Sequence, residues 1–397
     1  MSRALFLAAA AVGGCAATGL ESAPTDLSSP REKDAPLSPT PLARCSWPLW
    51  EAYAEAFIEN GRVVDRTDRH RTVSEGQAYG LFFALVADDP ARFDALLAWT
   101  RDNLLGGNWD EGLPAWLWGQ SKDRHWKVLD PNSATDADLW IGHTLLEAAR
   151  LWNRPELAEM GSALLERVLA SNLRQLPGLG PVLLPAPRGF EIRPGKRWRL
   201  NPSYVVPVQL ARLAALGLPG PWAELATTGE RLLVETSTAG LHPDWVIYDA
   251  AAGWIPDTQA APASSYDAIR VPLFVELGAP DAVRSAASGW LQRFSQSGRL
   301  TDRVPLYGTT HSSPRPAPVA YYAVLLPGAR RTSPETLYES VRERVSRFSR
   351  GPLYGSPPAY YDQNLVLFGL GFVENRFRFG SRGELEVAWS ETPCETS

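Results

Sequence analysis

From residue 45 onward, apolar residues recur at intervals of three and four positions, and this spacing limits the fold more than any other feature. A stripe with this period is the buried face of an α-helix. Counting such stripes predicts twelve helices, over 47–60, 76–88, 90–104, 134–153, 155–172, 203–216, 222–235, 265–278, 280–297, 316–326, 333–348 and 361–373. Strand signals are few and short, near 61–65 and 181–184. We therefore expect an all-α domain.

Polar motifs stand at the starts of the even-numbered helices in this count. They are Glu75 just before the second helix, ATDAD (134–138), NPSY (201–204), SSYDAIR (264–270) and AYYDQN (359–364). Helices joined by short loops tend to run antiparallel to their neighbours, so even-numbered starts would share one end of the molecule. A closed ring of helical hairpins, an α/α barrel with the even-numbered helices inside, would gather these motifs around one mouth.

Helix capping alone also predicts Asp, Asn and Ser at helix starts, so each motif has a purely structural interpretation. A functional site is favoured by the set of acidic residues, which stand beside aromatic residues or glycine: Glu75, Asp136, Asp138 and Asp267. Gly76 and Gly80 each cost a helix about 1 kcal/mol relative to Ala. That cost is easier to understand if something must approach this helix closely.

The composition argues against several classes of function. The net charge is −5 without a basic stripe, so we expect no nucleic-acid partner. The five histidines are scattered, and the chain has no HExxH or CxxC motif, so we expect no metal and no cofactor. A GxSxG nucleophile motif and a phosphate-binding loop are also lacking. Part of the large set of 15 Trp could form exposed platforms for flat apolar faces such as sugar rings.

Carboxylates accompanied by Trp and Tyr fit glycoside hydrolysis, which uses one protonated acid and one carboxylate opposite it. A helix N-terminus stabilises an ionised carboxylate and lowers its pKa, whereas a general acid needs a raised pKa. If Glu75 is the acid, partial burial and a nearby carboxylate must outweigh the helix dipole. Asp136 is the natural candidate for that neighbour.

The first twenty residues are typical of an export signal, with the short apolar run ALFLAAAAV ending near VGGC. VGGC resembles a bacterial lipobox, so we expect lipidation at Cys15 and an exported, periplasmic protein anchored to the outer membrane. Membrane contact would then occur only through this N-terminal lipid. Cleavage after Ala16 or Ala17 without lipid is the alternative.

Four segments follow from this pattern. They are a signal peptide (1–20), a flexible tether rich in Pro and Ser (21–44), a catalytic domain (45–385) and a C-terminal tail (386–397). In an exported chain Cys45 and Cys394 could join in a disulfide that ties together the ends of the domain. Two free thiols remain the alternative.

Several motifs resemble one known family. ATDADLWIGHTLLEAARLW (134–152) closely resembles the signature of glycoside hydrolase family 8, and SEGQAYG, NPSY and SYDAIR occur in that family's order. WPLWEAY, LPAWLWG, WRLNPSY and YYDQNLVLFG look like its branch of periplasmic endoglucanases from bacterial cellulose-synthesis operons. The resemblance covers about residues 45–380. It implies an (α/α)6 barrel and an inverting endo-β-1,4-glucanase that trims glucan beside a cellulose synthase complex.

The resemblance also implies roles for individual residues. Glu75 matches the general acid, Asp267 the general base, and Asp136 the carboxylate that contacts the sugar at the cleavage point. The residues implied to bind the β-1,4-glucan chain are Trp116, Trp198, Asn201, Tyr204, Tyr266, Arg270, Tyr360 and Tyr361. Among them, Trp116, Trp198 and Tyr266 look like sugar-stacking positions. One tyrosine of the YYDQ motif, Tyr360 or Tyr361, would hold the attacking water.

Other functions remain open at this point. An enzyme of the same fold could act on xylan, chitosan or mixed-linkage glucan, with the same motifs around the cleaved bond. A catalytically silent glycan-binding subunit of a polysaccharide export machine would not require an acid together with a base. In a structural helical envelope protein, any good helix cap could replace the polar helix starts.

Overall fold

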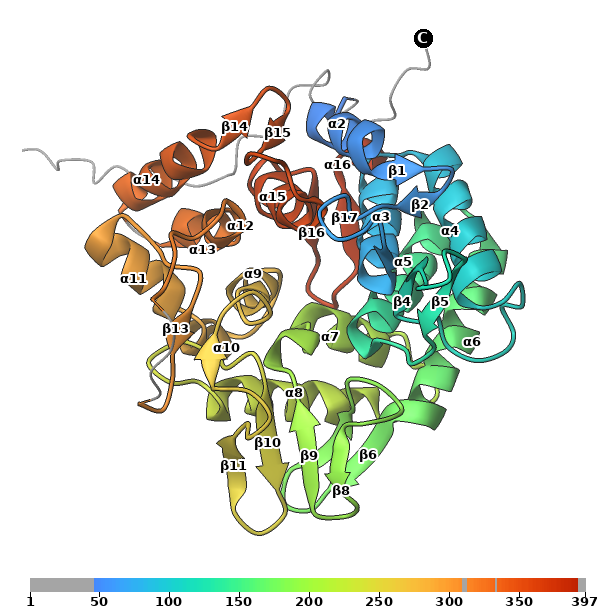
Figure 1. Ribbon diagram of the computed structural model, residues 1–397, viewed down its shortest axis with the longest axis horizontal. Coiled ribbons are helices and arrows are strands. Elements are labelled where there is room, and N and C mark those ends of the chain that lie inside the picture. The colour runs from blue at the N-terminus through green and yellow to red at the C-terminus, as the bar shows by residue number, and fades with distance from the viewer. Residues whose placement is uncertain (1–45, 309–312, 333, 392–397) are drawn as a thin grey trace, which may run out of the picture. The chain divides into compact units, whose positions relative to one another are not determined.

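The computed structural model describes residues 46–308, 313–332 and 334–391, and it folds as helices joined by short hairpins (Figure 1). The predicted signal peptide, the lipidation site at Cys15, the tether, and both Cys45 and Cys394 lie outside the described residues. Those expectations stay predictions. Within the described ranges, no helix combines the length and the apolar character needed to cross a membrane.

One set of helices forms a closed circuit of contacts. Its members are α3 (Ser74–Val86), α5 (Thr135–Leu151), α7 (Pro207–Ala215), α9 (Arg270–Glu276), α13 (Leu326–Arg331) and α15 (Tyr360–Val373). Each helix packs against the next in this order, and α15 returns to α3 (Figure 1). Helices α3 and α15 are buried around almost their whole circumference, as expected of helices enclosed by others.

A second set of helices packs outside the first. It comprises α2 (Pro48–Phe57), α4 (Pro90–Leu104), α6 (Pro155–Asn172), α8 (Trp222–Glu235), α10 (Asp281–Ala286), α11 (Gly289–Ser297) and α14 (Glu335–Ser346). Helices α4, α6 and α8 pack on α3, α5 and α7, and α10, α14 and α2 pack on α9, α13 and α15. These helices bury one stripe each, which is the period that the sequence shows. The prediction of a mainly helical chain is therefore confirmed.

Several predicted helix limits were wrong for identifiable reasons. The first helix ends at Phe57 rather than residue 60, because Ile58–Glu59 (β1) pairs with Arg62–Val63 (β2). Asn60 and Gly61 form the intervening turn with positive φ, the conformation typical of a two-residue Asn-Gly hairpin. The predicted segments 280–297 and 316–326 are interrupted. The first divides into α10 and α11, and the second is replaced by the short helix α12 (Ala320–Ala323) and α13.

The strand signals near 61–65 and 181–184 correspond to β2 and to β7 (Gly180–Leu183), and the strands are short, but the expectation that they would be few was wrong. Four antiparallel strands form a sheet in the order β11 (Gly253–Pro256), β10 (Val246–Asp249), β9 (Arg197–Leu200), β8 (Glu191–Arg193). A second sheet joins β3 (Thr72–Val73), β4 (Leu117–Gln120) and β5 (Trp126–Asp130). The remaining pairs are β6 (Leu173–Leu176) with β7 (Gly180–Leu183), β12 (Ala263–Ser264) with β13 (Val304–Pro305), β14 (Ser349–Arg350) with β15 (Leu353–Tyr354), and β16 (Phe377–Phe379) with β17 (Leu385–Val387). Strands this short give little periodic signal, and β9 finds its partner β10 only through the tertiary fold.

The predicted tail begins too early. Residues 386–391 belong to β17 and to α16 (Ala388–Glu391), and the indole of Trp389 donates a hydrogen bond to the carbonyl of Leu85 (3.0 Å). Trp389 also stacks with Trp152, with ring centroids 6.4 Å apart. The folded part of the chain therefore continues through Glu391 instead of ending at residue 385.

A buried ion-pair network ties α5 to α7 and β17. The carboxylate of Glu147 on α5 accepts a hydrogen bond from Arg212 Nε on α7 (2.6 Å) and one from the backbone N–H of Leu385 (3.0 Å). Arg150 donates to the same carboxylate from Nε (3.0 Å) and from a terminal nitrogen (2.6 Å). The Glu147 side chain is completely shielded from solvent. Losing its carboxylate would leave the Arg212 charge buried without a counter-ion.

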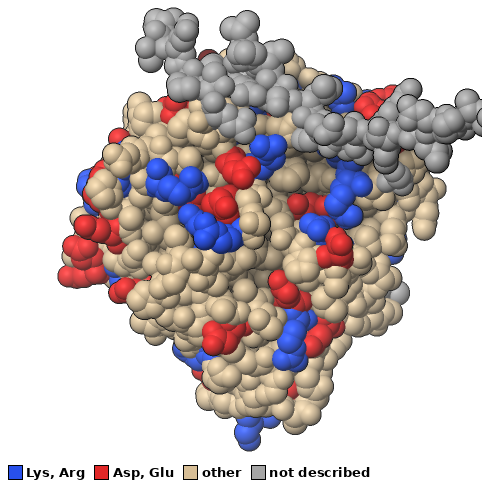
Figure 2. Space-filling view, turned by 180° about the vertical axis from the view of Figure 1, so that it is seen from behind, with Lys and Arg blue, Asp and Glu red and all other residues tan. Residues whose placement is uncertain are grey.

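On the face seen in Figure 2, acidic and basic side chains are interspersed rather than gathered by sign. Many of the exposed charges form local pairs of the Arg347–Glu343 kind, one helical turn apart. Such pairs are screened by water and contribute little to stability. The Glu147 network is therefore the better target for a test of electrostatic stabilisation.

We predict that Glu147→Ala lowers the free energy of unfolding by about 3–5 kcal/mol, the usual cost of leaving a buried charge unpaired. Urea denaturation followed by circular dichroism measures the change. Glu343→Ala, which removes the exposed partner of Arg347, is the matched control and should have a far smaller effect. Equal losses for the two variants would show that the Glu147 network does not stabilise the fold.

Candidate active site

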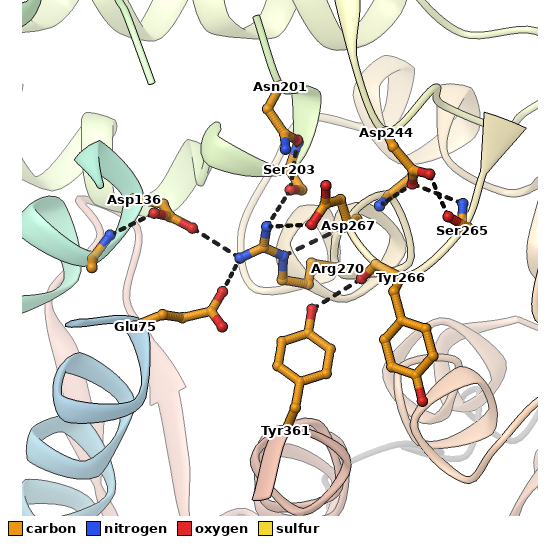
Figure 3. Close-up of polar contacts among 12 residues, drawn as sticks. Glu75, Asp136, Asn201, Ser203, Asp244, Ser265, Tyr266, Asp267, Arg270 and Tyr361 are labelled. Carbon is orange, nitrogen blue, oxygen red and sulfur yellow. Dashed lines mark hydrogen bonds and ion pairs between the residues drawn. The ribbon is translucent and has the colours of Figure 1, made fainter. Parts of the chain in front are cut away.

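Four helix starts and one turn bring the predicted polar residues together (Figure 3). Glu75 lies in the first turn of α3, Asp136 in the first turn of α5, and Tyr361 in the first turn of α15. Asn201 begins the short 3-10 helix η1 (Pro202–Tyr204), which precedes α7. Asp267 lies in the turn just before α9, because that helix begins at Arg270 and not at 265 as expected. The common meeting point is the guanidinium of Arg270.

Arg270 bridges three carboxylates and a hydroxyl. One terminal nitrogen contacts Glu75 Oε1 and lies 2.9 Å from Asp136 Oδ2. The other donates to Ser203 Oγ (2.7 Å) and lies 3.7 Å from Asp267 Oδ1. The Arg270 side chain is only 2% exposed, so its charge is compensated inside the protein. Glu75 and Asp267 therefore contact different terminal nitrogens of the Arg270 guanidinium.

Asn201 orients Ser203, the residue whose hydroxyl contacts Arg270. Its side-chain oxygen accepts hydrogen bonds from the backbone N–H (3.0 Å) and the hydroxyl (2.7 Å) of Ser203. The Ser203 hydroxyl thereby keeps a lone pair for Arg270. Asn201 is buried, so in this structure it orients the Arg270 partner rather than presenting itself to a ligand.

Burial raises the pKa of Glu75 to about 7. The positive charge of Arg270 opposes this shift, whereas the negative charges of Asp136 and Asp267 add to it, and a hydrogen bond from Tyr79 lowers the pKa slightly. The Glu75 side chain is still 17% exposed, so it can meet a ligand. Burial and the neighbouring carboxylates thus outweigh the charge of Arg270 and the hydrogen bond from Tyr79, and the pKa is raised, as a general acid requires.

The other two carboxyl groups have different environments. Asp136 is buried, and one of its oxygens accepts the backbone N–H of Ala137 (2.9 Å). Burial raises the pKa of Asp136, against the charge of Arg270. Asp267 is 40% exposed at its side chain and is the most open of the three. A carboxylate open to solvent can contact a water molecule, as an inverting reaction requires.

The two tyrosines at the start of α15 differ in position. The Tyr361 hydroxyl donates to the backbone carbonyl of Tyr266 (3.0 Å), next to Asp267 (Figure 3). Tyr360 is buried, and its ring packs beside Gly76 on α3. Tyr361 is therefore the member of the pair beside Arg270 and Asp267. The hydroxyl of Tyr266 in turn donates to Asp362 (3.0 Å).

The glycines of α3 have a packing explanation. A Cβ on Gly76 would lie 3.2 Å from Val63, and one on Gly80 would lie 3.2 Å from Val63 and 3.3 Å from Leu96. What approaches this helix closely is thus the β2 strand and α4. The sequence could not distinguish this neighbour from a ligand.

The three predicted sugar-stacking residues differ in how far they are buried. Trp116 is half-buried, and its carbonyl accepts the backbone N–H of Ser74 (3.0 Å), so it lies at the start of α3 beside Glu75. Tyr266 is 39% exposed and remains available to a ligand. Trp198 is buried at 2% exposure and packs near Tyr248 in the core behind the four-stranded sheet, so its assignment as a stacking residue was wrong. Trp198 is buried because its side chain lies on the side of β9 that faces the core.

The sequence patterns did not identify two candidate functional residues, Trp245 and Asp244. Trp245 lies 6.1 Å from the Tyr204 ring, which itself lies beneath the Arg270 guanidinium at 5.6 Å. Phe190 stacks on Trp245 (5.5 Å between centroids), and the Arg199 guanidinium lies 3.9 Å from the centroid of the Trp245 ring.

Asp244, the residue before Trp245, accepts hydrogen bonds from the turn that carries Asp267. The segment HPDW (242–245) does not open a helix, so the search for helix starts passed over it.

Asp138 lies two residues after Asp136 in the first turn of α5, and its side chain is completely buried. Burial raises its pKa well above the usual range. Among the described residues, no group of three or more His, Cys, Asp or Glu side chains is arranged to hold a metal ion. The three carboxyl groups around Arg270 have the composition of an acid–base site.

Comparison with known proteins identifies the family of this chain. Residues 40–375 match the family model for glycosyl hydrolases family 8. An endoglucanase of Escherichia coli O157:H7 is 40% identical over 356 residues, covering 88% of this chain and 93% of the relative.

Two solved structures extend the comparison. The endo-1,4-D-glucanase from Vibrio fischeri ES114 superimposes with a TM-score of 0.80 at 35% identity, over 87% of this chain and 99% of that one. The endo-β-1,4-glucanase CMCax from Acetobacter xylinum has a TM-score of 0.67 at 28% identity, over 84% and 98% of the two chains. The chain described here belongs to glycosyl hydrolase family 8.

Proposed function

We propose that this protein is an endo-β-1,4-glucanase that cleaves internal bonds of cellulose with inversion at the anomeric carbon. The observation that carries the proposal is the pairing of Glu75 and Asp267 across Arg270. Glu75 has a pKa near neutrality, and Asp267 is open to solvent. Glu75 can therefore keep a proton to donate near neutral pH, and Asp267 can contact the attacking water.

The proposed reaction uses these two groups in concert. Glu75 donates its proton to the glycosidic oxygen as the bond to the anomeric carbon breaks. A water molecule attacks that carbon from the opposite face and gives its proton to Asp267. Tyr361 is the proposed tyrosine that helps hold this water, because its hydroxyl lies beside Asp267. Asp136 contacts the sugar at the cleavage point and helps keep Glu75 protonated.

Arg270 keeps the three carboxyl groups in fixed relative positions. Its charge offsets part of the repulsion between them, and Ser203 and Asn201 hold its guanidinium in place. Positioned groups of this kind accelerate reactions because the geometry is set before the substrate arrives. Trp116, Tyr204 and Tyr266 are the proposed contacts for the sugar rings on either side.

For the fold we propose an (α/α)6 barrel. The closed circuit of α3, α5, α7, α9, α13 and α15, each with an outer helix, supports six helical hairpins arranged in a ring. The starts of α3, α5, α9 and α15 would then surround one mouth, where a glucan chain can cross. The short helix α12 and the second outer helix α11 are additions to this pattern.

The proposed setting is outside the cytoplasm. The first twenty residues favour export, and Cys15 favours a lipid anchor in the outer membrane. The motifs shared with cellulose-operon enzymes suggest that the protein trims glucan during bacterial cellulose synthesis and export, in functional contact with a cellulose synthase complex.

Xylan, chitosan or mixed-linkage glucan is the alternative substrate, since the groups around the cleaved bond do not identify sugars further away. A reducing-sugar assay on this panel of polymers and carboxymethylcellulose distinguishes them. A silent glycan-binding subunit is disfavoured, because binding alone would not require an acid of raised pKa beside an exposed carboxylate.

The first prediction from the proposed function concerns Glu75→Gln. Without its proton donor, the enzyme should lose activity on carboxymethylcellulose by about 10²–10⁴-fold, the usual contribution of general acid catalysis. Binding of cello-oligosaccharides, measured by calorimetry, should persist because the amide has the same shape. Glu51→Gln on the exposed face of α2 is the control. Activity within a few-fold of wild type would mean that Glu75 is only a first-turn residue.

The second prediction concerns pH. Because Glu75 must carry its proton to act, kcat/KM should fall as the pH rises through about 7, the pKa of this group. The loss should approach tenfold per pH unit well above that value, since the protonated fraction falls at that rate. Initial rates on a soluble cello-oligosaccharide between pH 4 and 9 give the profile. A rate that stays constant to pH 9 would contradict the assignment.

The third prediction concerns Asp267 and stereochemistry. Cleavage should release the α-anomer first, visible by proton NMR before mutarotation, and Asp267→Asn should abolish turnover because an amide cannot accept the proton. In a complex with substrate, the carboxyls of Glu75 and Asp267 should be separated by about 6.5–9.5 Å, not the roughly 5–5.5 Å of a retaining enzyme. Early β-anomer from the wild type would overturn both the mechanism and the role of Asp267.

A further inference from the structure

The turn that carries Asp267 is held by a carboxylate from another part of the chain. Residues 265–269 precede α9, and the short-range backbone hydrogen bonds here run from Ile269 N–H to Ser265 O (3.0 Å), from Arg270 N–H to Asp267 O (3.3 Å) and from Val271 N–H to Ala268 O (3.1 Å). Asp244 lies 21 positions before Ser265, just ahead of β10. Its own backbone N–H donates to the carbonyl of Ala263 (2.8 Å), so Asp244 is fixed beside the turn.

The side chain of Asp244 reaches both ends of the catalytic segment. Oδ1 accepts the backbone N–H of Ser265 (2.8 Å) and that of Ala268 (3.0 Å), and Oδ2 accepts the hydroxyl of Ser265. In the sequence, Tyr266 and Asp267 lie between these two donors. Within the described residues, every hydrogen bond of this carboxylate goes to the turn. A single group thus fixes the backbone on each side of Asp267.

We propose that Asp244 is a positioning residue for the reaction, whose hydrogen bonds to Ser265 and Ala268 hold Asp267 in register with Glu75 and Arg270. This inference rests on the proposed role of Asp267 as the base. The Asp267 carboxylate is 40% exposed, and its ion pair within the described residues is a long contact to Arg270 at 3.7 Å, so the backbone of the turn largely determines where this carboxylate lies. A displacement of about 1 Å in a reacting group can cost about 10²-fold in rate.

The environment of Asp244 supports this interpretation. Burial raises its pKa to about 6, and the charge of Asp267 raises it further. A buried carboxylate close to another carboxylate is a costly way to close a turn, because both charges repel. The cost is understandable if the fixed turn serves the chemistry. Asp249, at the other end of β10, offers a comparison. It accepts the backbone N–H groups of Ala251 (2.9 Å) and Ala252 (3.1 Å) in a hairpin remote from Arg270.

The test compares Asp244→Ala with Asp244→Asn and with Asp249→Ala, all in the full-length chain. Asp244→Ala should lower kcat on a soluble cello-oligosaccharide by about 10–10²-fold, with KM within about threefold of wild type, because the sugar-binding residues remain. Asp244→Asn should recover most of kcat. Its amide oxygen still accepts both backbone N–H groups, and its NH₂ can donate to the Ser265 hydroxyl. Asp249→Ala should leave kcat unchanged while removing the same number of backbone hydrogen bonds.

Two outcomes would overturn the inference. One is a kcat for Asp244→Ala equal to that of Asp249→Ala, which would leave Asp244 with a structural role alone. The other is an Asp244→Asn variant as impaired as Asp244→Ala, which would assign the effect to charge and not to positioning.

A milder variant keeps the test decisive if Asp244→Ala does not fold. Ser265→Ala removes only the bond to Oδ2, and it should lower kcat by about three- to tenfold at unchanged KM; an unchanged kcat would overturn the inference. Asp267→Asn separates this inference from the proposed function. If Asp267→Asn turns over normally, the base assignment fails. If it is inactive while Asp244→Ala is normal, only the role of Asp244 fails.

Discussion

The candidate site depends on one buried cation. Arg270 is enclosed by protein and pairs with Glu75, Asp136 and Asp267, which reach it from three different elements. Three carboxyl groups so close together would repel one another strongly without it, and a buried guanidinium without them would be equally costly. The cation and the carboxyl groups therefore require each other. Their mutual dependence holds α3, α5 and the turn before α9 in one arrangement.

The same interaction explains how two carboxyl groups of similar chemistry acquire different properties. Glu75 is buried in the first turn of α3, where desolvation and its acidic neighbours outweigh the charge of Arg270 and raise its pKa. Asp267 lies outside regular helix, in a turn open to solvent. In acid–base sites the environment of each carboxyl group sets its role. Here the difference in environment follows from where each helix begins.

Much of the fold was predictable because helical burial is a local, periodic property. The stripes at three and four positions located α3, α4, α5, α6, α8 and α15 within a few residues. The polar starts of the inner helices also identified Glu75, Asp136 and Asp267 as neighbours in space. The errors arose where a local pattern competes with a distant partner. Asn60-Gly61 ended the first helix early, and β9 became a strand only by pairing with β10.

The sequence by itself determined the helical class, the residue types at the helix starts and, through the motifs shared with family 8, the chemistry expected of them. Only the tertiary structure decided which aromatic residues stay exposed. Trp198 and Trp116 are the same residue type, yet Trp198 is buried near Tyr248 whereas Trp116 is half-buried. The tertiary structure also decided the partners of Arg270 and Asp244. Arg270 and Glu75 are separated by 195 positions, and no local spacing encodes a contact over that distance. Burial and electrostatic pairing are properties of the assembled chain, and for that reason they become visible only in three dimensions.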